Sequence, residues 1–123
     1  MGITNIEVVS VPVSDQDQAK AFYINTLGFE LVGDNPMGPD MRWVQVRPPG
    51  GGASLTLVTW FETMPPGSLK GLVVNCDDIE STYEELKGRG VTFDGPIESQ
   101  GWGKFATFDD PDGNGIVLRE AVL

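Results

Sequence analysis

The sequence predicts an α+β fold in which two tandem βαβββ modules form a mixed, curved eight-stranded sheet. Two observations predict it. A strand, a helix and three further strands follow in the same order twice along the 123 residues. Each helix is also preceded by an acidic residue and followed by a glycine. We expect a single domain, with module 1 over about residues 1–62 and module 2 over about residues 66–123.

The first module begins with a strand in which valines alternate, so that Val9, Val11 and Val13 share one face. Ser14 or Asp15 is expected to cap the next helix, because both side chains accept hydrogen bonds from free backbone N–H groups. The expected ranges are 6–13 for the first strand, 17–27 for the helix, and 29–32, 41–47 and 53–58 for the other strands.

The second module repeats this order after a proline-rich break at residues 65–67. Asp77 or Asp78 is expected to cap its helix, and Gly90 to end it. A dense turn, DDPDGNG at residues 109–115, is expected to lead into the last strand, because Asp, Asn, Pro and Gly favour tight turns. The expected strands are 71–76, 91–93, 104–108 and 115–122.

The two modules match along their whole length. Val74 corresponds to Val11 in the first strands, and Gly90 corresponds to Gly28 after the helices. The interval between matched residues is one residue shorter after the helix than before it, so one helical residue is missing from the second copy. This pattern indicates an internal duplication.

The charge of the chain excludes some classes of partner. Eight Lys and Arg residues against 18 Asp and Glu residues leave a net charge of −10, which disfavours nucleic acids and anionic membranes and favours a cationic ligand. The same charge also serves solubility alone. Because the chain has no histidine, it offers neither an imidazole base nor a histidine metal ligand.

Cysteine content and hydropathy indicate the compartment. The lone Cys76 excludes an internal disulfide and fits a reducing compartment. The chain shows no signal-peptide pattern, and no apolar run approaches the roughly 20 residues that span a bilayer. We therefore expect a cytoplasmic protein without a membrane partner.

Strand alternation separates a face that each module's helix covers from a face that no helix covers. The uncovered face is mostly apolar with a few polar groups, which is typical of ligand clefts. We expect apolar residues to form its floor and aromatic residues its walls. The expected ligand-binding residues are Val8, Trp43, Gln45, Leu55, Leu57, Gly71, Val73, Trp102, Phe105, Thr107, Val117 and Arg119. The alternative for any one of them is a contact between modules or between subunits.

Three segments, residues 11–32, 73–91 and 105–118, resemble the glyoxalase, bleomycin-resistance and extradiol dioxygenase superfamily, also called vicinal oxygen chelate proteins. The resemblance implies the glyoxalase/bleomycin-resistance fold over essentially the whole chain. It also implies that family enzymes hold a divalent metal at four strand positions. Those positions correspond here to Val8, Leu55, Gly71 and Val117, and none of these side chains binds a metal. We therefore expect no metal and no cofactor.

Two other groups of acidic residues make poor metal sites. Asp110 and Asp112 match the first positions of an EF-hand calcium loop, but its twelfth position holds Ala121 instead of glutamate. Glu7 and Glu120 lie near two of the family's metal positions. Shifting either strand by one residue would turn its core side chains outward.

These observations leave three hypotheses for function. The first is a metal-free protein that binds or sequesters a small aromatic or amphipathic molecule, cationic ones included, as the bleomycin-resistance branch does, with a homodimer completing the cleft as that resemblance implies. The second is a metal-independent, or less readily a metal-dependent, lyase, isomerase or dioxygenase. The third is a structural module whose cleft has become a subunit contact. We favour the first, and no residue is singled out as catalytic.

Overall fold

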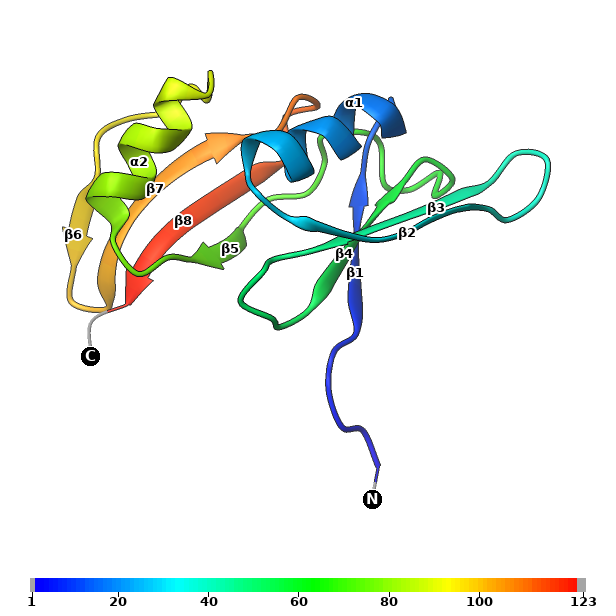
Figure 1. The fold of residues 1–123 in the computed structure, drawn as a ribbon, viewed down its shortest axis with the longest axis horizontal. Helices are drawn as coiled ribbons and strands as arrows, with labels where there is room; N and C mark the ends of the chain where they lie inside the picture. Colours follow the sequence, from blue (N-terminus) through cyan, green and yellow to red (C-terminus); the bar gives the residue numbers. More distant parts are fainter. Residues whose placement is uncertain (1, 122–123) are drawn as a thin grey trace. The chain divides into compact units, whose positions relative to one another are not determined.

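The computed structural model describes residues 2–121 and confirms the α+β fold with the βαβββ order present twice (Figure 1). Its eight strands lie in two four-stranded mixed sheets, one from each copy. Contacts divide the chain into two units, with the boundary between Pro66 and Gly67. We call them unit 1 and unit 2 and describe each by itself.

Unit 1 contains the first sheet and its helix. Its elements are β1 (Val8–Pro12), α1 (Gln16–Ala21), η1 (Phe22–Thr26), β2 (Glu30–Pro36), β3 (Arg42–Arg47) and β4 (Ser54–Val58). The strand order is β1-β4-β3-β2, in which β1 and β4 are parallel and the other pairs antiparallel. The parallel pair joins the first and last strands of the copy, with the helix between them in sequence.

The helix of unit 1 begins at a side-chain cap and ends in a wider turn. Oδ1 of Asp15 accepts a hydrogen bond of 3.0 Å from the backbone N–H of Gln18, so Asp15 and not Ser14 is the cap. The last turn is a π-helix over η1, which the sequence did not predict, and Tyr23 within it is fully buried. Gly28 follows with φ +82°, a conformation that glycine adopts without strain.

The core of unit 1 lies between α1 and one face of its sheet. Nε2 of Gln16 donates hydrogen bonds to the carbonyl oxygens of Arg42 and Leu57, at 2.7 and 2.8 Å, which joins the start of α1 to β3 and β4. The strand side chains of this core are Val11, Val44, Val46, Leu55 and Leu57. Val58 is also buried, but it lies on the opposite face of β4 with Thr56.

The strand register corrects two predicted site residues. Val46 lies opposite Leu55, and Val11 lies opposite Leu57, so both leucines share the helix-covered face with the core valines. Leu55 is 4% exposed and Leu57 0%. Their predicted place on the uncovered face is wrong. Thr56, which lies opposite Gln45, takes that place.

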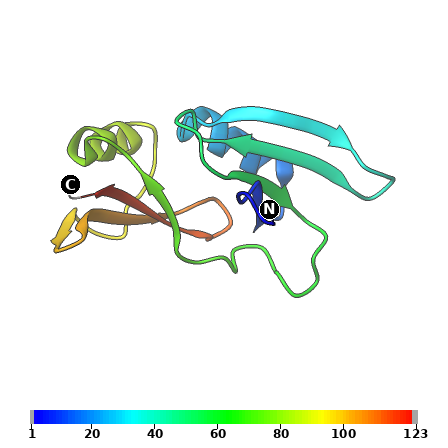
Figure 2. The same ribbon diagram turned by 90° about the horizontal axis from the view of Figure 1, so that it is seen from below.

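Unit 2 contains the second sheet, shown from below in Figure 2. Its elements are β5 (Leu72–Asn75), α2 (Ile79–Gly88), β6 (Glu98–Gln100), β7 (Gly103–Asp109) and β8 (Gly115–Ala121). The order is β5-β8-β7-β6, with β5 and β8 parallel, so unit 2 repeats the topology of unit 1. Asp78, and not Asp77, caps α2 by accepting a hydrogen bond from the N–H of Ser81.

The predicted strand at residues 91–93 is not a named strand of the structure. Phe93 makes one isolated bridge to Phe108, and the edge strand of unit 2 is β6 instead. The ring of Phe93 packs against Tyr83 and Phe108, with ring centroids 4.2 and 5.2 Å apart, so its apolar character reflects core packing. The last predicted strand extends to residue 122, which lies outside the described residues.

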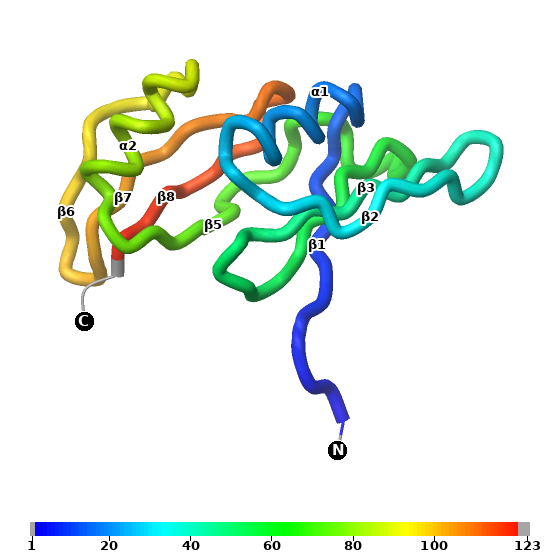
Figure 3. Tube along the Cα trace, viewed as in Figure 1, coloured from blue at the N-terminus to red at the C-terminus, as the bar shows by residue number. Residues whose placement is uncertain are grey.

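Figure 3 traces the backbone of the turn between β7 and β8. The side chains of Asp110 and Asn114 form a buried polar network in this turn. Oδ1 of Asp110 accepts hydrogen bonds from the N–H groups of Asp112 and Asn114, both at 2.9 Å. Oδ1 of Asn114 accepts one from the N–H of Leu69, which ties the start of unit 2 to the turn. The Asp110 carboxylate, which matched the first position of a calcium loop, therefore holds the backbone of the turn.

Candidate ligand-binding site

The uncovered face of unit 1 carries a polar row across three strands. Ser10, Thr56 and Gln45 lie opposite one another on β1, β4 and β3. Val8 lies opposite Ser54 in the neighbouring row. These side chains stand on the face away from α1, because residues of opposite parity on the same strands form the core.

Two tryptophans are stacked on unit 1. The rings of Trp43 and Trp60 have centroids 6.4 Å apart and an interplanar angle of 25°. Nε1 of Trp43 donates a hydrogen bond of 3.0 Å to Oε1 of Gln45, which fixes the indole beside the polar row. Trp43 and Gln45 were expected here. Trp60 was not, because it lies in the irregular segment after β4 and has no strand pattern to place it.

Thr56 places a buried hydroxyl in this row. Its side chain is 2% exposed, and its Oγ1 has no hydrogen-bond partner among residues 2–121. Burial of an unpaired hydroxyl costs about 1–3 kcal/mol. The row therefore contains a buried hydroxyl that no residue among 2–121 satisfies.

A hollow of about 390 Å³ opens at one end of unit 1. Gln45 lines it together with charged residues, including Glu7, Glu30 and Arg47. Nε of Arg47 lies 3.3 Å from Oε1 of Glu30, and both side chains are about half exposed. The hollow is more polar than the floor expected from the sequence.

Unit 2 carries a second stack on its uncovered face. Phe105 and Arg119 lie opposite each other on β7 and β8, and Trp102 occupies the short turn between β6 and β7. The rings of Trp102 and Phe105 are stacked, with centroids 5.0 Å apart and an angle of 25°. Cζ of Arg119 lies 5.6 Å from the Trp102 ring centroid. Three predicted site residues thus form one cluster.

Three more predicted residues, Gly71, Thr107 and Val117, line a hollow of about 380 Å³ in unit 2. Oγ1 of Thr107 donates a hydrogen bond of 2.9 Å to Oδ2 of Asp94. Val73 lies opposite Val117 and is 50% exposed. Two apolar residues predicted for the floor, Val73 and Val117, therefore lie side by side on this sheet.

The two stacks occupy equivalent positions of the duplication. Trp43 of β3 and Phe105 of β7 correspond to each other, because the same interval separates them as separates Gly28 from Gly90. The second ring of each stack comes from a different place: Trp60 follows β4, whereas Trp102 precedes β7. Each uncovered face thus presents an aromatic pair beside a polar side chain.

The side chains do not fit the divalent metal of the family's enzymes. Gln45 and Thr107 are equivalent residues of the two copies, and they pair with Thr56 and Val117. Thr56, and not Leu55, is therefore the residue equivalent to Val117 among the family's four metal positions. The other positions hold Val8, Gly71 and Val117. Hydrocarbon and one hydroxyl supply no imidazole or carboxylate, which are the usual oxygen and nitrogen ligands.

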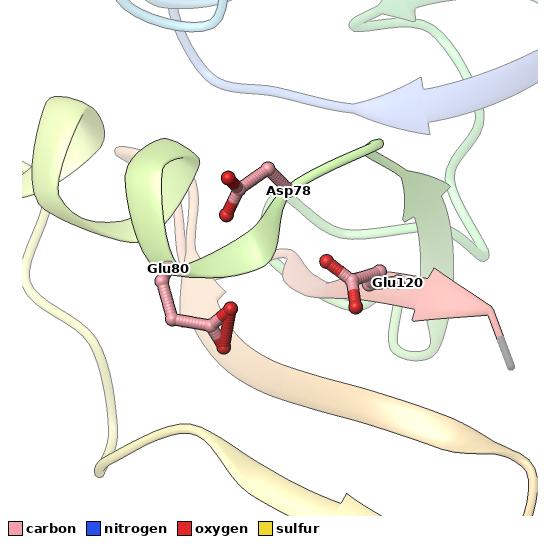
Figure 4. Close-up of side chains that lie close together, drawn as sticks. All are labelled: Asp78, Glu80 and Glu120. Carbon is pink, nitrogen blue, oxygen red and sulfur yellow. The ribbon is translucent and has the colours of Figure 1, made fainter.

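A cluster of three carboxylates lies elsewhere in unit 2, formed by Asp78, Glu80 and Glu120 (Figure 4). Oε1 of Glu120 accepts a hydrogen bond of 2.9 Å from the N–H of Ile79, at the start of α2. Oε2 of Glu80 lies 3.2 Å from Nζ of Lys104 and raises the pKa of that ammonium. The cluster therefore caps and neutralises the helix start, where carboxylates are favourable.

The strongest ionic group of unit 1 also has a structural role. Both oxygens of Asp34 accept hydrogen bonds from Arg42, and Nζ of Lys20 lies 2.8 Å from Oδ2. These bonds hold the pKa of Asp34 well below its ordinary value and the pKa of Arg42 above its own. The group joins α1 to the β2–β3 hairpin.

Known proteins share this fold and sequence. The family model described as Glyoxalase/Bleomycin resistance protein/Dioxygenase superfamily matches residues 5–118. The chain belongs to this superfamily. The resemblance inferred from the three segments is thereby confirmed, and with it the glyoxalase/bleomycin-resistance fold.

Relatives with solved structures cover nearly the whole chain. TnmS3, described as an antibiotic binding protein from Streptomyces sp. CB03234, is 50% identical, with a TM-score of 0.92 and 99% of each chain covered. A superfamily member from Sphaerobacter thermophilus DSM 20745 is 41% identical, with a TM-score of 0.91 and coverage of 98% of this chain and 99% of that one. YetH of Bacillus subtilis (strain 168), described as uncharacterized, is 40% identical over 121 residues, which are 96% of this chain and 99% of YetH.

Helix length bears on the expected absence of a membrane partner. Among residues 2–121, no helix is both long enough and apolar enough to cross a membrane.

Proposed function

We propose that this superfamily member binds and sequesters a small planar aromatic or amphipathic molecule, without a metal. The observation that carries the proposal is the stacked aromatic pair on each uncovered face, at equivalent strand positions. Aromatic rings stack on planar ligands and contribute about 0.5–1.5 kcal/mol per pair beyond the area they bury. A polar partner beside each pair, Gln45 or Arg119, would orient the ligand.

The residues at the family's metal positions support binding over metal-assisted catalysis. Polarising two neighbouring ligand oxygens needs a Lewis acid, and Val8, Thr56, Gly71 and Val117 do not provide its ligands. A ligand held on these faces would meet rings, methyl groups, an amide and a guanidinium. This chemistry favours retention of the ligand unchanged.

The relatives suggest which ligands to try first. TnmS3 is named as an antibiotic binding protein, and half of its aligned residues are identical to those of this chain. We therefore propose that the ligand of this chain is an antibiotic or a compound of similar aromatic character, and that the protein contributes to resistance by sequestering it in the cytoplasm. We also propose the homodimer that the family resemblance implies, which light scattering after size exclusion would test.

A thermal-shift screen tests the proposed binding. The chain is melted with planar aromatic, glycopeptide and polyketide-like compounds, each with and without Zn²⁺, Ni²⁺ or Mn²⁺. A ligand present at 100 times its Kd stabilises the folded chain by about 2.7 kcal/mol, so a true ligand gives a clear rise in Tm. We expect this rise without metal.

Variants and mass spectrometry distinguish the outcomes. Trp43→Ala and Trp102→Ala are expected to reduce the shift, whereas Met37→Ala, which removes an exposed apolar side chain away from both pairs, serves as the control. A ligand recovered unchanged after long incubation supports sequestration. Formation of a product would identify an enzyme instead, and the absence of any stabilising compound would contradict ligand binding.

A further inference from the structure

Arg119 is held in place on the uncovered face of unit 2. It stands in one row with Asn75 and Phe105, which lie opposite it on β5 and β7. Nη2 of Arg119 donates a hydrogen bond of 2.9 Å to the carbonyl oxygen of Trp102, and the guanidinium lies against the indole of the same residue. Hydrogen bond and ring contact together fix the plane of the guanidinium.

The guanidinium keeps donors that the described residues do not use. A guanidinium has five N–H donors, and the structure shows one of them bonded to Trp102. Within residues 2–121 no ion pair includes Arg119, although the chain carries a net charge of −10. A fixed cation on a partly apolar face is suited to an acceptor from outside the chain.

The charged groups around Arg119 do not replace that acceptor. Glu98 lies opposite Phe105, one strand further from Arg119 in the same row. Asp94 accepts the hydrogen bond of Thr107. Glu120, next in sequence, accepts the N–H of Ile79 and so points toward the start of α2. Among the four residues of this row, Arg119 is therefore the one cation.

We propose that the uncovered face of unit 2 recognises a carboxylate on the edge of a planar aromatic ligand, with Arg119 as its partner and Trp102 as the stacking surface. Trp102 stays 49% exposed although its ring contacts both Phe105 and Arg119, so the residue offers surface to a ligand beside the guanidinium. The exposed Asn75 adds an amide donor beside the guanidinium. The inference rests on the proposed ligand binding and opposes the cationic ligand that net charge alone favours.

Three probes with one ring system test this preference. Equilibrium dialysis at neutral pH measures the affinity of the full chain for 2-naphthoate, 2-methylnaphthalene and 2-naphthylmethylammonium. We expect the wild-type chain to bind the carboxylate about tenfold more tightly than the neutral ring, because a charge-assisted pair contributes roughly 1.5 kcal/mol or more. The ammonium should bind least.

Two matched variants locate the preference. Arg119→Gln should weaken binding of 2-naphthoate about tenfold and leave 2-methylnaphthalene within about twofold. Arg89→Gln removes the same charge from the end of α2, where Arg89 pairs with Glu85, and should leave all three affinities unchanged. Circular dichroism confirms that each variant is folded, and Arg119→Lys should keep part of the preference, because a lysine retains the charge without the planar fork.

The possible failures are distinguishable. Equal binding of all three rings to the wild-type chain, or unchanged binding of 2-naphthoate to Arg119→Gln, would overturn the carboxylate site and leave aromatic binding intact. Preferential binding of the ammonium would overturn the inference in favour of a cationic ligand. Failure of every probe to bind the wild-type chain would count against the proposed function itself.

Discussion

Nδ2 of Asn114 donates a hydrogen bond of 2.8 Å to Oδ2 of Asp110, and both side chains are buried in the turn between β7 and β8. The pair fixes a tight turn and, through Leu69, the beginning of unit 2. We expect Asn114→Ala to lower the free energy of unfolding by about 2–4 kcal/mol, because buried partners are left unpaired. Urea denaturation measures this loss. Asn35→Ala, at an exposed position, is the control, and equal losses would contradict the role of the turn.

Thr56→Val should stabilise the chain. Valine has nearly the shape of threonine and removes the buried hydroxyl that residues 2–121 leave unpaired, so we expect a gain of about 1 kcal/mol. Thr107→Val is the matched control, because the Thr107 hydroxyl donates to Asp94 and its removal should be neutral or destabilising. Thermal melting of both variants decides the point. A loss of stability in Thr56→Val would mean that its hydroxyl is satisfied.

Asp34 should make stability depend on acid pH. Hydrogen bonds from Arg42 and Lys20 lower its pKa in the folded chain, so its contribution is present above its ordinary pKa of about 4 and is lost as the pH falls toward the folded value. We expect Asp34→Asn to lower the free energy of unfolding by about 1–2 kcal/mol at neutral pH. This loss should become smaller as the pH falls below about 4. Urea denaturation across this range measures the difference.

The control for this pH dependence is Asp40→Asn, which changes an exposed carboxylate in the same hairpin. Its effect on the free energy of unfolding should be small at every pH. A loss for Asp34→Asn that stays constant from neutral to acid pH would show that the pairs with Arg42 and Lys20 do not supply the stability.

Gly67→Ala should destabilise unit 2. Gly67 has φ +82°, and a Cβ atom there would overlap the carbonyl oxygen of Asp112 in the polar turn. We expect a loss of about 2 kcal/mol or more, since both the backbone strain and the overlap oppose the substitution. Gly95→Ala, where φ is not positive and the space is open, is the control for thermal melting. Equal behaviour of the two variants would contradict the close approach.

Divalent metals should not stabilise the chain. With Val8, Thr56, Gly71 and Val117 at the four strand positions, Zn²⁺, Ni²⁺ or Mn²⁺ at modest concentration should leave Tm unchanged. The double variant Asp78→Asn, Glu80→Gln controls for weak binding at the acidic cluster. A metal-dependent rise in Tm that persists in this variant would show that another metal site exists.

The sequence predicted the order of elements, both acidic caps and most of the covered faces, because these depend on local periodicity and capping. It misplaced β4 by one residue. The second copy loses a further residue between its counterparts of β3 and β4, so Thr56, and not Leu55, corresponds to Val117. The apolar–polar alternation of Leu55 and Leu57 is the same whether these two residues face the core or the uncovered side of the sheet. The pairing of Leu55 with Val46 in the folded sheet places both leucines on the core face.

Two further differences came from contacts that no local pattern encodes. Phe93 comes soon after α2, where the sequence predicted a strand, but its ring packs between Tyr83 and Phe108. Trp60 lies in an irregular segment, and only the folded chain brings it against Trp43. Both residues are placed by tertiary packing, which overrides a weak sequence preference.

The two aromatic pairs have a consequence for how this duplicated chain can change. In each pair one ring belongs to an equivalent strand, and the other ring comes from a connecting segment that differs between the copies. The polar neighbour of the pair is an amide in unit 1 and a guanidinium in unit 2. A substitution of Trp60 or Trp102 would therefore remove one ring of a single pair and leave the two equivalent strand residues, Trp43 and Phe105, in place.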